Sequence, residues 1–492
     1  MSGLIKDYVS FKVPSDRNQR IANDVYKCNF KITGVHQSLS NGLRRAILSS
    51  IPVVSFDDTY YDNGNKNIDI LKNVSALHNE FIAHRISLIP ICMYKNRTLQ
   101  VLVDFDYKEQ KFVYSFVNEG NIPEFNIKIK NDEATRELLK TNTDNSINIL
   151  SNHIKIEDKE GKVFNPVDEF IVPDYITGDY CLLHRLKPIS SNEEVQEAEE
   201  LHIEMKLTVG TSKINARYCP VGTVSYEFEK EEEPVINKNF DLYMETLQKQ
   251  RETSAYENES DKLKRFTEED IAKFKGSYNL LEAERIFKKN EFDEPLSVKF
   301  CVESVGNLPT DQIVYDALNI IELHTIAILN MFKWNEYKKS YHFNSQKINI
   351  EKNKQSGLIE MTIWHIDHTL GNLIGSYIKR LFIINKMIGE YLNFGTYKMP
   401  HPLEDKITIY IGFKEGVSLN PIFAKYGLKS ELTNEIDMAI QVVFLACSSY
   451  LSDISKLKSN WTEVSGISKT SYLVNPDNEF LSGSAFDKRS QF

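Results

Sequence analysis

Apolar residues recur at helical spacing in four segments of the chain. One helix is predicted over 39–50, and a second, with a wider apolar stripe, begins at 369. Longer helices are predicted over 311–333 and 435–457, each downstream of one of the first pair. Because every stripe must be buried, the four helices are expected to pack together as a bundle. The residues expected to join the two shorter helices are Leu39, Leu43, Ile47, Leu370, Leu373, Ile374, Tyr377 and Ile378.

Short alternating segments fill the region between Phe56 and Tyr226. Two examples are 99–105 and 201–207, where apolar and polar residues alternate as they do in half-buried strands. This pattern favours one β-rich domain inserted into the chain.

Polar and charged stretches suggest where the domains end. The segment 229–275 is crowded with charge and is interpreted as a solvated helical or partly disordered insertion. A polar connector near 337–357 and the Ser-, Asn- and Gly-rich tail after Trp461 are both expected to be mobile. The predicted organisation is a first module (1–58 and 290–335), a β-rich insert (59–228), a charged insertion (229–289), a linker (336–357), a second module (358–460) and a flexible tail (461–492).

A loose internal repeat relates the two shorter helices. The sequence SLSNGL at 38–43 recurs as TLGNLI at 369–374, and both copies follow a histidine and precede another long helix. The match is short, so either duplication or coincidence could produce it. For Asn41 and Asn372 a capping or turn role near the helix start is favoured over contact with a partner. Gly371 would permit a close backbone approach or an unusual dihedral angle.

Composition narrows the choice of function. The 492 residues allow two to four domains, and the formal net charge of -10 argues against direct DNA binding, which depends on basic side chains. The six cysteines are scattered, with no CxxC pair to hold zinc or an iron–sulfur cluster, and no cofactor is expected. Neither a secretory signal nor a continuous apolar run of membrane-spanning length is found, so a soluble intracellular protein with no membrane contact is expected.

Several motifs, in a fixed order, resemble those of a known family. The segments SLSNGLRRAILSSIP (38–52) and LHNEFIAHRISLIP (77–90) resemble the signature of α-type RNA polymerase subunits, as do 216–226 and 302–309 further along. That family includes bacterial α, archaeal D and the third-largest subunit of eukaryotic polymerase II. The later segments DHTLGNL (367–373) and GTYKMPHPL (395–403) resemble its small partner, archaeal L or the eleventh subunit of the eukaryotic enzyme. A fusion of the two resembles the arrangement in some large DNA viruses.

The resemblance implies a fold and a role. It implies an α+β chain in which two α-type dimerisation modules form an intramolecular pseudo-heterodimer, with the β-rich insert in the first half. The role would be non-catalytic assembly of a polymerase with its largest and second-largest subunits and other small subunits, in the cytoplasm or nucleus of an infected cell, with the virion as a further location. The second half would contact the largest subunit. Its motif residues are His368, Thr369, Gly371, Asn372, His401 and Pro402.

An arginine pair distinguishes the first copy of the repeat. Arg44 and Arg45 align with Gly375 and Ser376, so only the first half has them. The resemblance assigns the pair to docking of the second-largest subunit, for which Arg has suitable multidentate donors. The alternative is that both arginines pair with acidic residues of the same fold. The full set of predicted large-subunit contacts is Asn41, Arg44, Arg45, Glu80, His84 and Arg85.

Other functions have weaker support from the residues. His78, Glu80 and His84 suggest metal or acid–base chemistry, but the PCxxC element that accompanies HxE in zinc deaminases is absent. A hydrolase or transferase would need a phosphate-binding glycine loop or a nucleophile elbow, and neither motif is found. A free-standing interaction protein that kept the dimerisation fold is the remaining alternative. Some relatives hold zinc or an iron–sulfur cluster, but the cysteines here cannot supply either site.

Overall fold

The computed structural model describes most of the chain. The described residues are 4–12, 25–59, 66–95, 99–106, 108–109, 111–139, 144–158, 160–161, 163–164, 169–174, 176–188, 198–253, 265–384, 388–467 and 473–474. The centre of the charged insertion (254–264) and most of the predicted tail therefore lie outside the described residues. The expected mobility of the tail stays a prediction.

The first half of the chain builds an antiparallel sheet of four strands. Their order is β1 (Ile5–Lys12), β2 (Val25–Thr33), β15 (Ser297–Ser304) and β14 (Val221–Phe228). Every second residue of β2 faces the core, as the two-residue repeat of a strand requires. These buried residues are Tyr26, Cys28, Phe30 and Ile32. Helices α1 (Gln37–Ser49) and α8 (Thr310–Asn330) pack against β14 and β2 respectively.

A second antiparallel sheet lies in the last third of the chain. Its order is β18 (Ile348–Lys352), β19 (Ile359–Trp364), β21 (Lys406–Phe413) and β20 (Leu392–Lys398). Helix α9 (His368–Lys379) packs on β20 and β21 and continues into η6 (Arg380–Ile384), a single π-helical turn.

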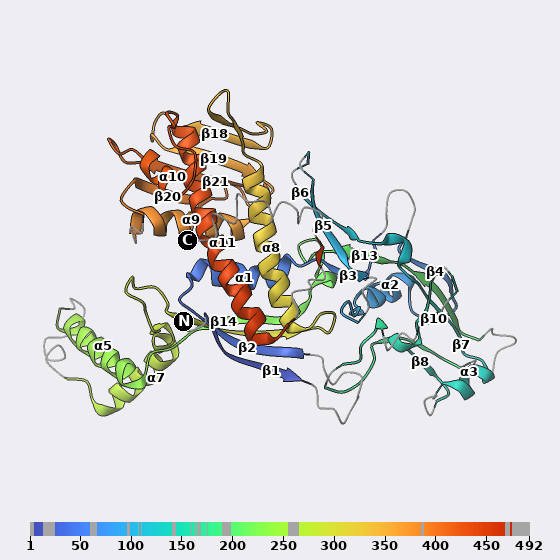
Figure 1. Ribbon diagram of the computed structural model, residues 1–492. Helices are drawn as coiled ribbons and strands as arrows, with labels where there is room; N and C mark the ends of the chain where they lie inside the picture. The colour runs from blue at the N-terminus through green and yellow to red at the C-terminus, as the bar shows by residue number, and fades with distance from the viewer. Residues whose placement is uncertain are drawn as a thin grey trace.

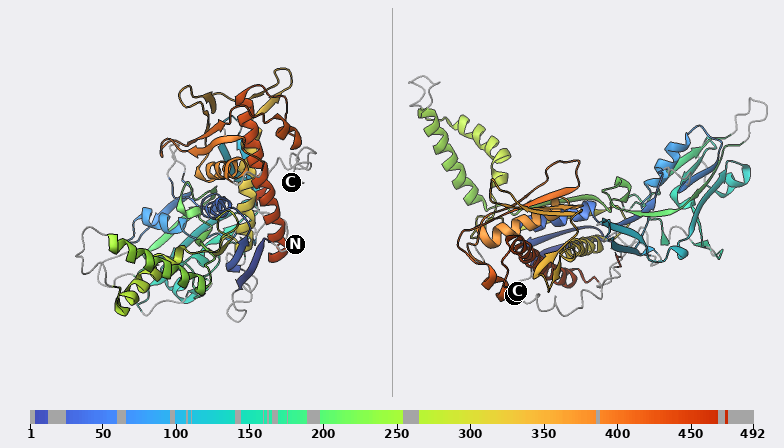
Figure 2. Two further views of the ribbon diagram at one scale, coloured as in Figure 1. Left: turned by 90° about the vertical axis from the view of Figure 1, so that its left-hand side faces the viewer. Right: turned by 90° about the horizontal axis from the view of Figure 1, so that it is seen from above.

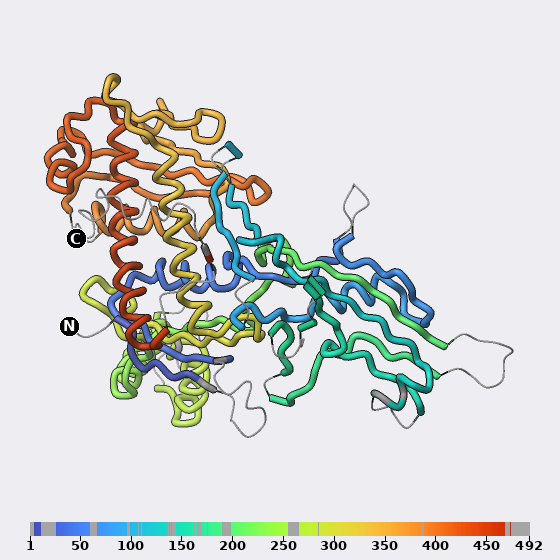
Figure 3. Tube along the Cα trace, turned by 45° about the vertical axis from the view of Figure 1, so that its right-hand side comes forward, coloured from blue at the N-terminus to red at the C-terminus, as the bar shows by residue number. Residues whose placement is uncertain are grey.

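Four helices join the two sheets. Helix α1 contacts α8 and α9, and α11 (Glu435–Ser465) contacts the same two, so the helices form a closed ring. Figures 1 and 3 show α8 and α11 running side by side from one sheet to the other. Helix α11 also reaches β1 of the first sheet, where Trp461 is fully buried. It therefore extends past the predicted end at 457, before Gly466 terminates it at φ 70°.

The region expected to be β-rich extends to one side of this helical junction. Its largest sheet has five strands, in the order β10 (Val163–Phe164), β9 (Lys155–Glu157), β7 (Glu124–Lys130), β12 (Glu200–Met205) and β4 (Ile68–Asn73). Helix α2 (Asn79–Ser87) contacts β4, and it also contacts β3 (Val53–Phe56) and β11 (Leu182–Leu186). The smaller pairings are β3 with β13 (Leu207–Gly210), β11 with β8 (Ile147–Leu150), and β5 (Val101–Asp106) with β6 (Lys111–Phe116) and β22 (Leu473–Val474).

The charged insertion forms a hairpin of two helices, α5 (Glu233–Thr253) and α7 (Glu268–Leu281). Aromatic contacts of Tyr278 with Phe240 and Tyr243, at ring-centroid distances of 5.1 and 5.2 Å, hold the two helices together. Figure 2 shows this hairpin and the β-rich region at opposite ends of the molecule.

The predicted linker differs most from expectation. The segment 336–357 contains β17 (Ser340–His342), which pairs with β16 (Lys333–Asn335), and also β18, an edge strand of the second sheet. Ile348 and Ile350 point inward from β18 and are buried. The connector therefore contributes to the core, because two apolar residues at strand spacing outweigh its polar composition.

Helices α8 and α11 are long and apolar enough to span a membrane by length and composition alone. In the most apolar stretch of each helix, 72% of the residues of α8 and 67% of those of α11 are buried inside the structure. Their apolar residues are thus used in the helical junction between the two sheets.

Candidate functional site

The two shorter helices of the junction begin in the same way. Nδ1 of His36 accepts a hydrogen bond from the backbone N–H of Ser38 at 3.1 Å and caps α1. A carboxylate oxygen of Asp367 accepts one from the backbone N–H of Thr369 at 3.0 Å and caps α9. Each cap satisfies an N–H that the first helical turn leaves unpaired.

Asn41 and Asn372 do not cap these helices, so that prediction is wrong. Both lie inside the helix, because α1 and α9 begin several residues earlier than the asparagines. The side-chain oxygen of Asn41 accepts hydrogen bonds from Nε and Nη2 of Arg44 at 3.3 and 3.2 Å. That of Asn372 accepts one from the Ser376 hydroxyl at 3.2 Å. The asparagines therefore orient neighbouring side chains one turn away.

Two glycines allow close packing around α9. A Cβ atom added at Gly42 of α1 would lie 3.4 Å from Cδ1 of Leu373, so the two helices approach each other closely there. A Cβ atom at Gly371 would lie 2.6 Å from Cδ2 of Tyr397, which leaves no room for one. The close backbone approach predicted for Gly371 is thus present in the structure.

The residues predicted to join α1 and α9 are all buried, with relative exposures of 0 to 6%. The two helices are in contact, and both sets of side chains belong to one continuous core. These buried residues are Leu39, Leu43, Ile47, Leu370, Leu373, Ile374, Tyr377 and Ile378.

The two arginines of α1 make different contacts. Nε of Arg45 donates a hydrogen bond to the Thr369 hydroxyl at 2.9 Å, which links α1 to the first turn of α9. Arg44 stays on its own helix, bonded to Asn41. Both arginines are half-buried, and within the described ranges no carboxylate lies at ion-pairing distance from either. The structure therefore does not support the alternative in which both pair with acidic residues of the fold.

An ion pair lies beside this contact. Nζ of Lys213 is 2.6 Å from a carboxylate oxygen of Asp367, the residue that caps α9. Burial by itself would raise the pKa of Asp367, but the charge and hydrogen bond of Lys213 outweigh it and lower that pKa to about 2. The pair ties the turn after β13 to the start of α9.

Most residues of the second-half motif gather at the same end of α9. His368 is exposed, and its Nδ1 lies 3.3 Å from the Tyr397 hydroxyl. His401 and Pro402 are exposed on the loop that follows β20, next to Leu403, which is 90% exposed. The motif thus forms a surface at the N-terminal end of α9 that continues onto this loop.

The other residues predicted to contact a large subunit lie on α2, which follows α1 and β3 in the chain. Glu80, His84 and Arg85 are exposed, and Nη2 of Arg85 donates a hydrogen bond to the backbone oxygen of Leu182 at 2.6 Å.

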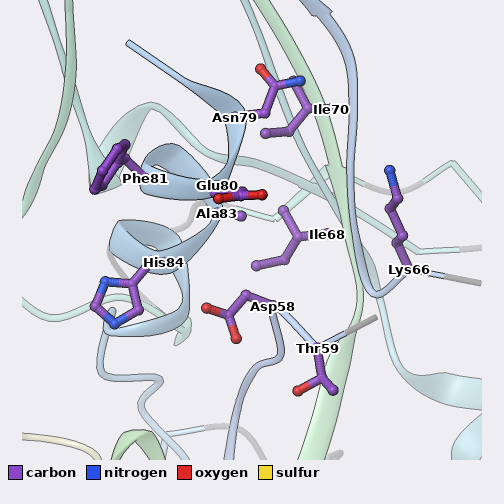
Figure 4. Close-up of a pocket in the computed structure, with 10 residues that line it drawn as sticks. All are labelled: Asp58, Thr59, Lys66, Ile68, Ile70, Asn79, Glu80, Phe81, Ala83 and His84. Carbon is purple, nitrogen blue, oxygen red and sulfur yellow. The ribbon is translucent and has the colours of Figure 1, made fainter. Parts of the chain in front are cut away.

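Phe81 of the same helix was not among the predicted residues. It is 64% exposed, a large value for an aromatic side chain. Figure 4 shows Glu80 turned toward β4 and Phe81 on the other side of the helix. The hollow beside α2 measures about 500 Å³, and its lining includes Asp58, Thr59, Lys66, Ile68, Ile70, Asn79, Glu80, Phe81, Ala83 and His84.

The geometry does not favour a metal site on α2. Nδ1 of His78 accepts a hydrogen bond from the backbone N–H of Glu80 at 3.4 Å and thereby caps the helix. Among the described residues, no group of three or more His, Cys, Asp or Glu side chains is arranged to hold a metal ion. His78 therefore contributes to the local structure by capping α2.

A buried ion-pair cluster at the base of the β-rich region was missed from the sequence. Arg217 lies 2.8 Å from Asp57 through Nη1 and 2.5 Å from Asp58 through Nη2, and its side chain is only 6% exposed. Asp57 and Asp58 directly follow the buried strand β3. The only signal in the sequence was this acidic pair after an apolar run, which does not identify a partner so far along the chain.

We expect Lys213→Met to remove a pH-dependent contribution to stability. The folded-state pKa of Asp367, about 2, lies below its unfolded value of about 3.9, so the pair stabilises the fold above about pH 4 and loses this effect as pH falls toward 2. The full pKa difference corresponds to roughly 2.6 kcal/mol, and solvent screening of Lys213, which is 44% exposed, reduces it. Urea unfolding should therefore show a deficit of about 2 kcal/mol for the variant at pH 7 and almost none near pH 2. Lys414→Met, which breaks the exposed Lys414–Glu390 pair, should cost less than about 1 kcal/mol. A deficit that stays constant from pH 7 to pH 2 would contradict the assignment.

Comparison with known proteins adds independent information. A family model described as the RNA polymerase Rpb3/Rpb11 dimerisation domain matches residues 29–325. The chain is 24% identical over 210 residues to subunit RPAC1 of DNA-directed RNA polymerases I and III from Saccharomyces cerevisiae. It is also 24% identical over 333 residues to subunit 3 of polymerases II, IV and V from Arabidopsis thaliana, and 39% identical over 62 residues to subunit Rpo3 from Pyrococcus furiosus.

These relatives are covered to different extents. The match spans 41% of this chain and 54% of the yeast protein, so about half of that relative is represented. For the Arabidopsis protein the shares are 64% and 91%, and for the archaeal protein 13% and 20%. The matched family region ends within α8 and leaves α9 and α11 outside.

Proposed function

The chain belongs to the RNA polymerase Rpb3/Rpb11 dimerisation-domain family, and from this premise we propose that it is a non-catalytic assembly subunit of a multisubunit DNA-directed RNA polymerase. In this proposal residues 1–335 correspond to the α-type subunit and residues 358–460 to its small partner. One polypeptide then supplies the platform on which the two largest subunits associate.

The ring of helices is the observation that carries this proposal. Each sheet contributes one shorter and one longer helix, and α1 and α8 contact α9 and α11 across the ring. Leu373 of one half packs on Gly42 of the other, as expected of a dimerisation interface. Joining two such halves in one chain makes their association intramolecular, so the linker sets their effective concentration. This arrangement supports an intramolecular pseudo-heterodimer.

The proposed docking surfaces consist of motif residues that are exposed or half-buried. We assign Arg44 and Arg45, with Asn41 orienting Arg44, to the second-largest subunit. The exposed face of α2 would extend this contact through Glu80, His84 and Arg85. Phe81, at 64% exposure, would give it an apolar centre, which protein interfaces favour.

The second half is assigned to the largest subunit. The candidate surface is the N-terminal end of α9 with the loop after β20, where His368, His401 and Pro402 are exposed. Thr369 and Gly371 are buried and would act by shaping this end of the helix. Asn372, half-buried and bonded to Ser376, would lie at its edge. The fused arrangement also leads us to propose a viral polymerase acting in the nucleus or cytoplasm of an infected cell.

Co-purification tests the proposed function. The tagged full-length chain, expressed in its natural host, should bring with it two very large polypeptides and DNA-dependent RNA synthesis. Recovery of the chain without either would favour the free-standing interaction protein instead.

We expect Arg45→Ala to weaken capture of the second-largest subunit at least tenfold, because a half-buried charged donor at an interface is costly to lose. The substitution also breaks the bond to Thr369, so Thr369→Val serves as the matched control. A pull-down should show a large loss for Arg45→Ala and a small one for Thr369→Val, with both variants folded by circular dichroism. Equal losses would mean that Arg45 acts only within the helix junction.

A further inference from the structure

A cavity lies at the junction of the two halves, away from both proposed docking surfaces. Its volume is about 370 Å³, which falls within the size range of pockets for small organic ligands. Gly34 lines it from the first half, shortly before α1. The other lining residues come from η6, from Ile388 ahead of β20, from the segment that follows α10 (Asn420–Lys425) and from α11. It is therefore a defined space that the polymerase proposal does not use.

One wall of the cavity is apolar. Leu381 and Leu445 are buried, and Ile388, Tyr426 and Leu428 are half-buried around it. These five side chains could cover a hydrocarbon chain or ring. Such burial stabilises a ligand by about 25 cal/mol for each Å² of apolar surface removed from water.

Small hydroxyl residues also line the cavity. Ser448, Ser449 and Ser452 follow Leu445 on the same face of α11. Their small side chains leave space beside the helix, and the hydroxyls of Ser448 and Ser449 can donate hydrogen bonds into it.

A cation lies at the polar end. Arg380 opens η6 and lines the cavity, and its guanidinium lies near the Tyr377 phenol. Its Nε is buried and has no hydrogen-bond partner within the part of the chain that the structure describes. An unsatisfied buried donor of this kind costs about 1–3 kcal/mol unless a ligand or water accepts from it.

The acidic group nearby is already engaged. Asp453 accepts a hydrogen bond from the Tyr377 hydroxyl at 2.8 Å and lies 3.7 Å from Lys456. In the described ranges no carboxylate forms an ion pair with Arg380. The cavity is thus lined by two cations, Arg380 and Lys456, and by one carboxylate, Asp453, so its lining carries a net positive charge. The π-helical turn that begins with Arg380 adds weight, because such turns are frequent at functional sites.

We propose that this cavity binds a small amphipathic monoanion, with a carboxylate at Arg380 and an apolar chain or ring against Leu381 and Leu445. The serine hydroxyls donate further hydrogen bonds to the carboxylate. The site joins elements of both halves, so its ligand stabilises their packing. This inference rests on the cavity alone and holds whether or not the chain joins a polymerase.

Three probes with the same ten-carbon chain test the proposal: decanoate, decanol and decylamine, each below its aggregation concentration. Isothermal titration with the full-length chain should show tightest binding for decanoate, weaker binding for decanol and the weakest for decylamine. Arg380→Gln should lower the decanoate affinity roughly ten- to a hundredfold and leave decanol nearly unchanged, since only the charged hydrogen bond is lost. Lys379→Gln, which alters the exposed neighbouring residue of α9, should change neither affinity.

A second variant protects the test against misfolding. Ser449→Phe fills the cavity from α11 and should abolish binding of both decanoate and decanol, with the melting temperature retained or raised. Retained decanol binding by Arg380→Gln shows that this variant is folded. Three results would each overturn the proposal: no decanoate binding, equal affinities for decanoate and decylamine, or binding that Ser449→Phe leaves intact.

Discussion

Replacing Arg217 with methionine is expected to lower the free energy of unfolding by about 3–5 kcal/mol, the cost of removing one partner from a buried ion pair. Its side chain is 6% exposed and neutralises Asp57 and Asp58, whose side chains are 10% and 20% exposed. Without the guanidinium two carboxylates remain close together in a poorly solvated site. Urea unfolding followed by circular dichroism measures the loss.

A comparable but exposed pair provides the control. Arg185 and Asp144 lie 2.7 Å apart, with side chains 51% and 58% exposed, so Arg185→Met should cost less than about 1 kcal/mol. Adding Asp57→Asn and Asp58→Asn to Arg217→Met should recover part of the stability, because it removes the uncompensated charge. Similar losses for Arg217→Met and Arg185→Met would refute the importance of burial here.

Truncation of Trp461 to alanine is expected to cost about 3–5 kcal/mol, as for other fully buried aromatic residues. The indole is completely buried between Phe30 and Tyr8, with ring-centroid distances of 4.8 and 5.3 Å. Its Nε1 donates a hydrogen bond to the backbone oxygen of Asp311 at 2.9 Å. The residue thus fixes the end of α11 to β1, β2 and α8, and its loss should also release that end to proteases.

Trp461→Phe separates the packing from the hydrogen bond. It keeps an aromatic ring and should cost roughly 1–2 kcal/mol, from the lost bond and the smaller volume. Trp364→Ala, at a half-buried position of β19, should be milder than Trp461→Ala. Limited proteolysis that cleaves near residue 461 no faster in Trp461→Ala than in the unmodified chain would contradict the proposed anchoring.

The helices were the most predictable part of the fold. Their apolar stripes repeat at the helical period, and this local signal gave starts within two residues for α1, α8, α9 and α11. The end of α11 was missed because Trp461, although it follows Leu457 at helical spacing, lies among polar residues, and its burial depends on Tyr8 and Phe30 of strands far away in the sequence. Local periodicity carries no information about such a partner.

Two errors elsewhere have different origins. The connector was expected to be mobile from its polar composition, yet β18 forms because β19 offers it a pairing edge. The asparagines were expected to cap their helices, but His36 and Asp367 lie nearer the first turn and accept its N–H groups. The first outcome depends on a neighbouring strand, whereas the second is a local error in where the two helices begin.

The candidate site was predictable only in part. The motif resemblance selected Arg44, Arg45 and α2, and these residues are at least partly exposed. It did not show that Arg45 bonds to Thr369, because that contact joins residues 324 positions apart. The cavity beside Arg380 could likewise not be predicted from the sequence, since four separate segments enclose it.

The course of α11 has a consequence for biosynthesis. This helix leaves the ribosome long after β1 and β2, yet it contacts β1 and packs Trp461 on Phe30 of β2. The first sheet therefore emerges with an apolar face that stays uncovered until α11 has been translated. Such a nascent chain is prone to aggregation and folds slowly. We therefore expect chaperones to hold it longer than a chain whose early strands are covered by elements close to them in the sequence.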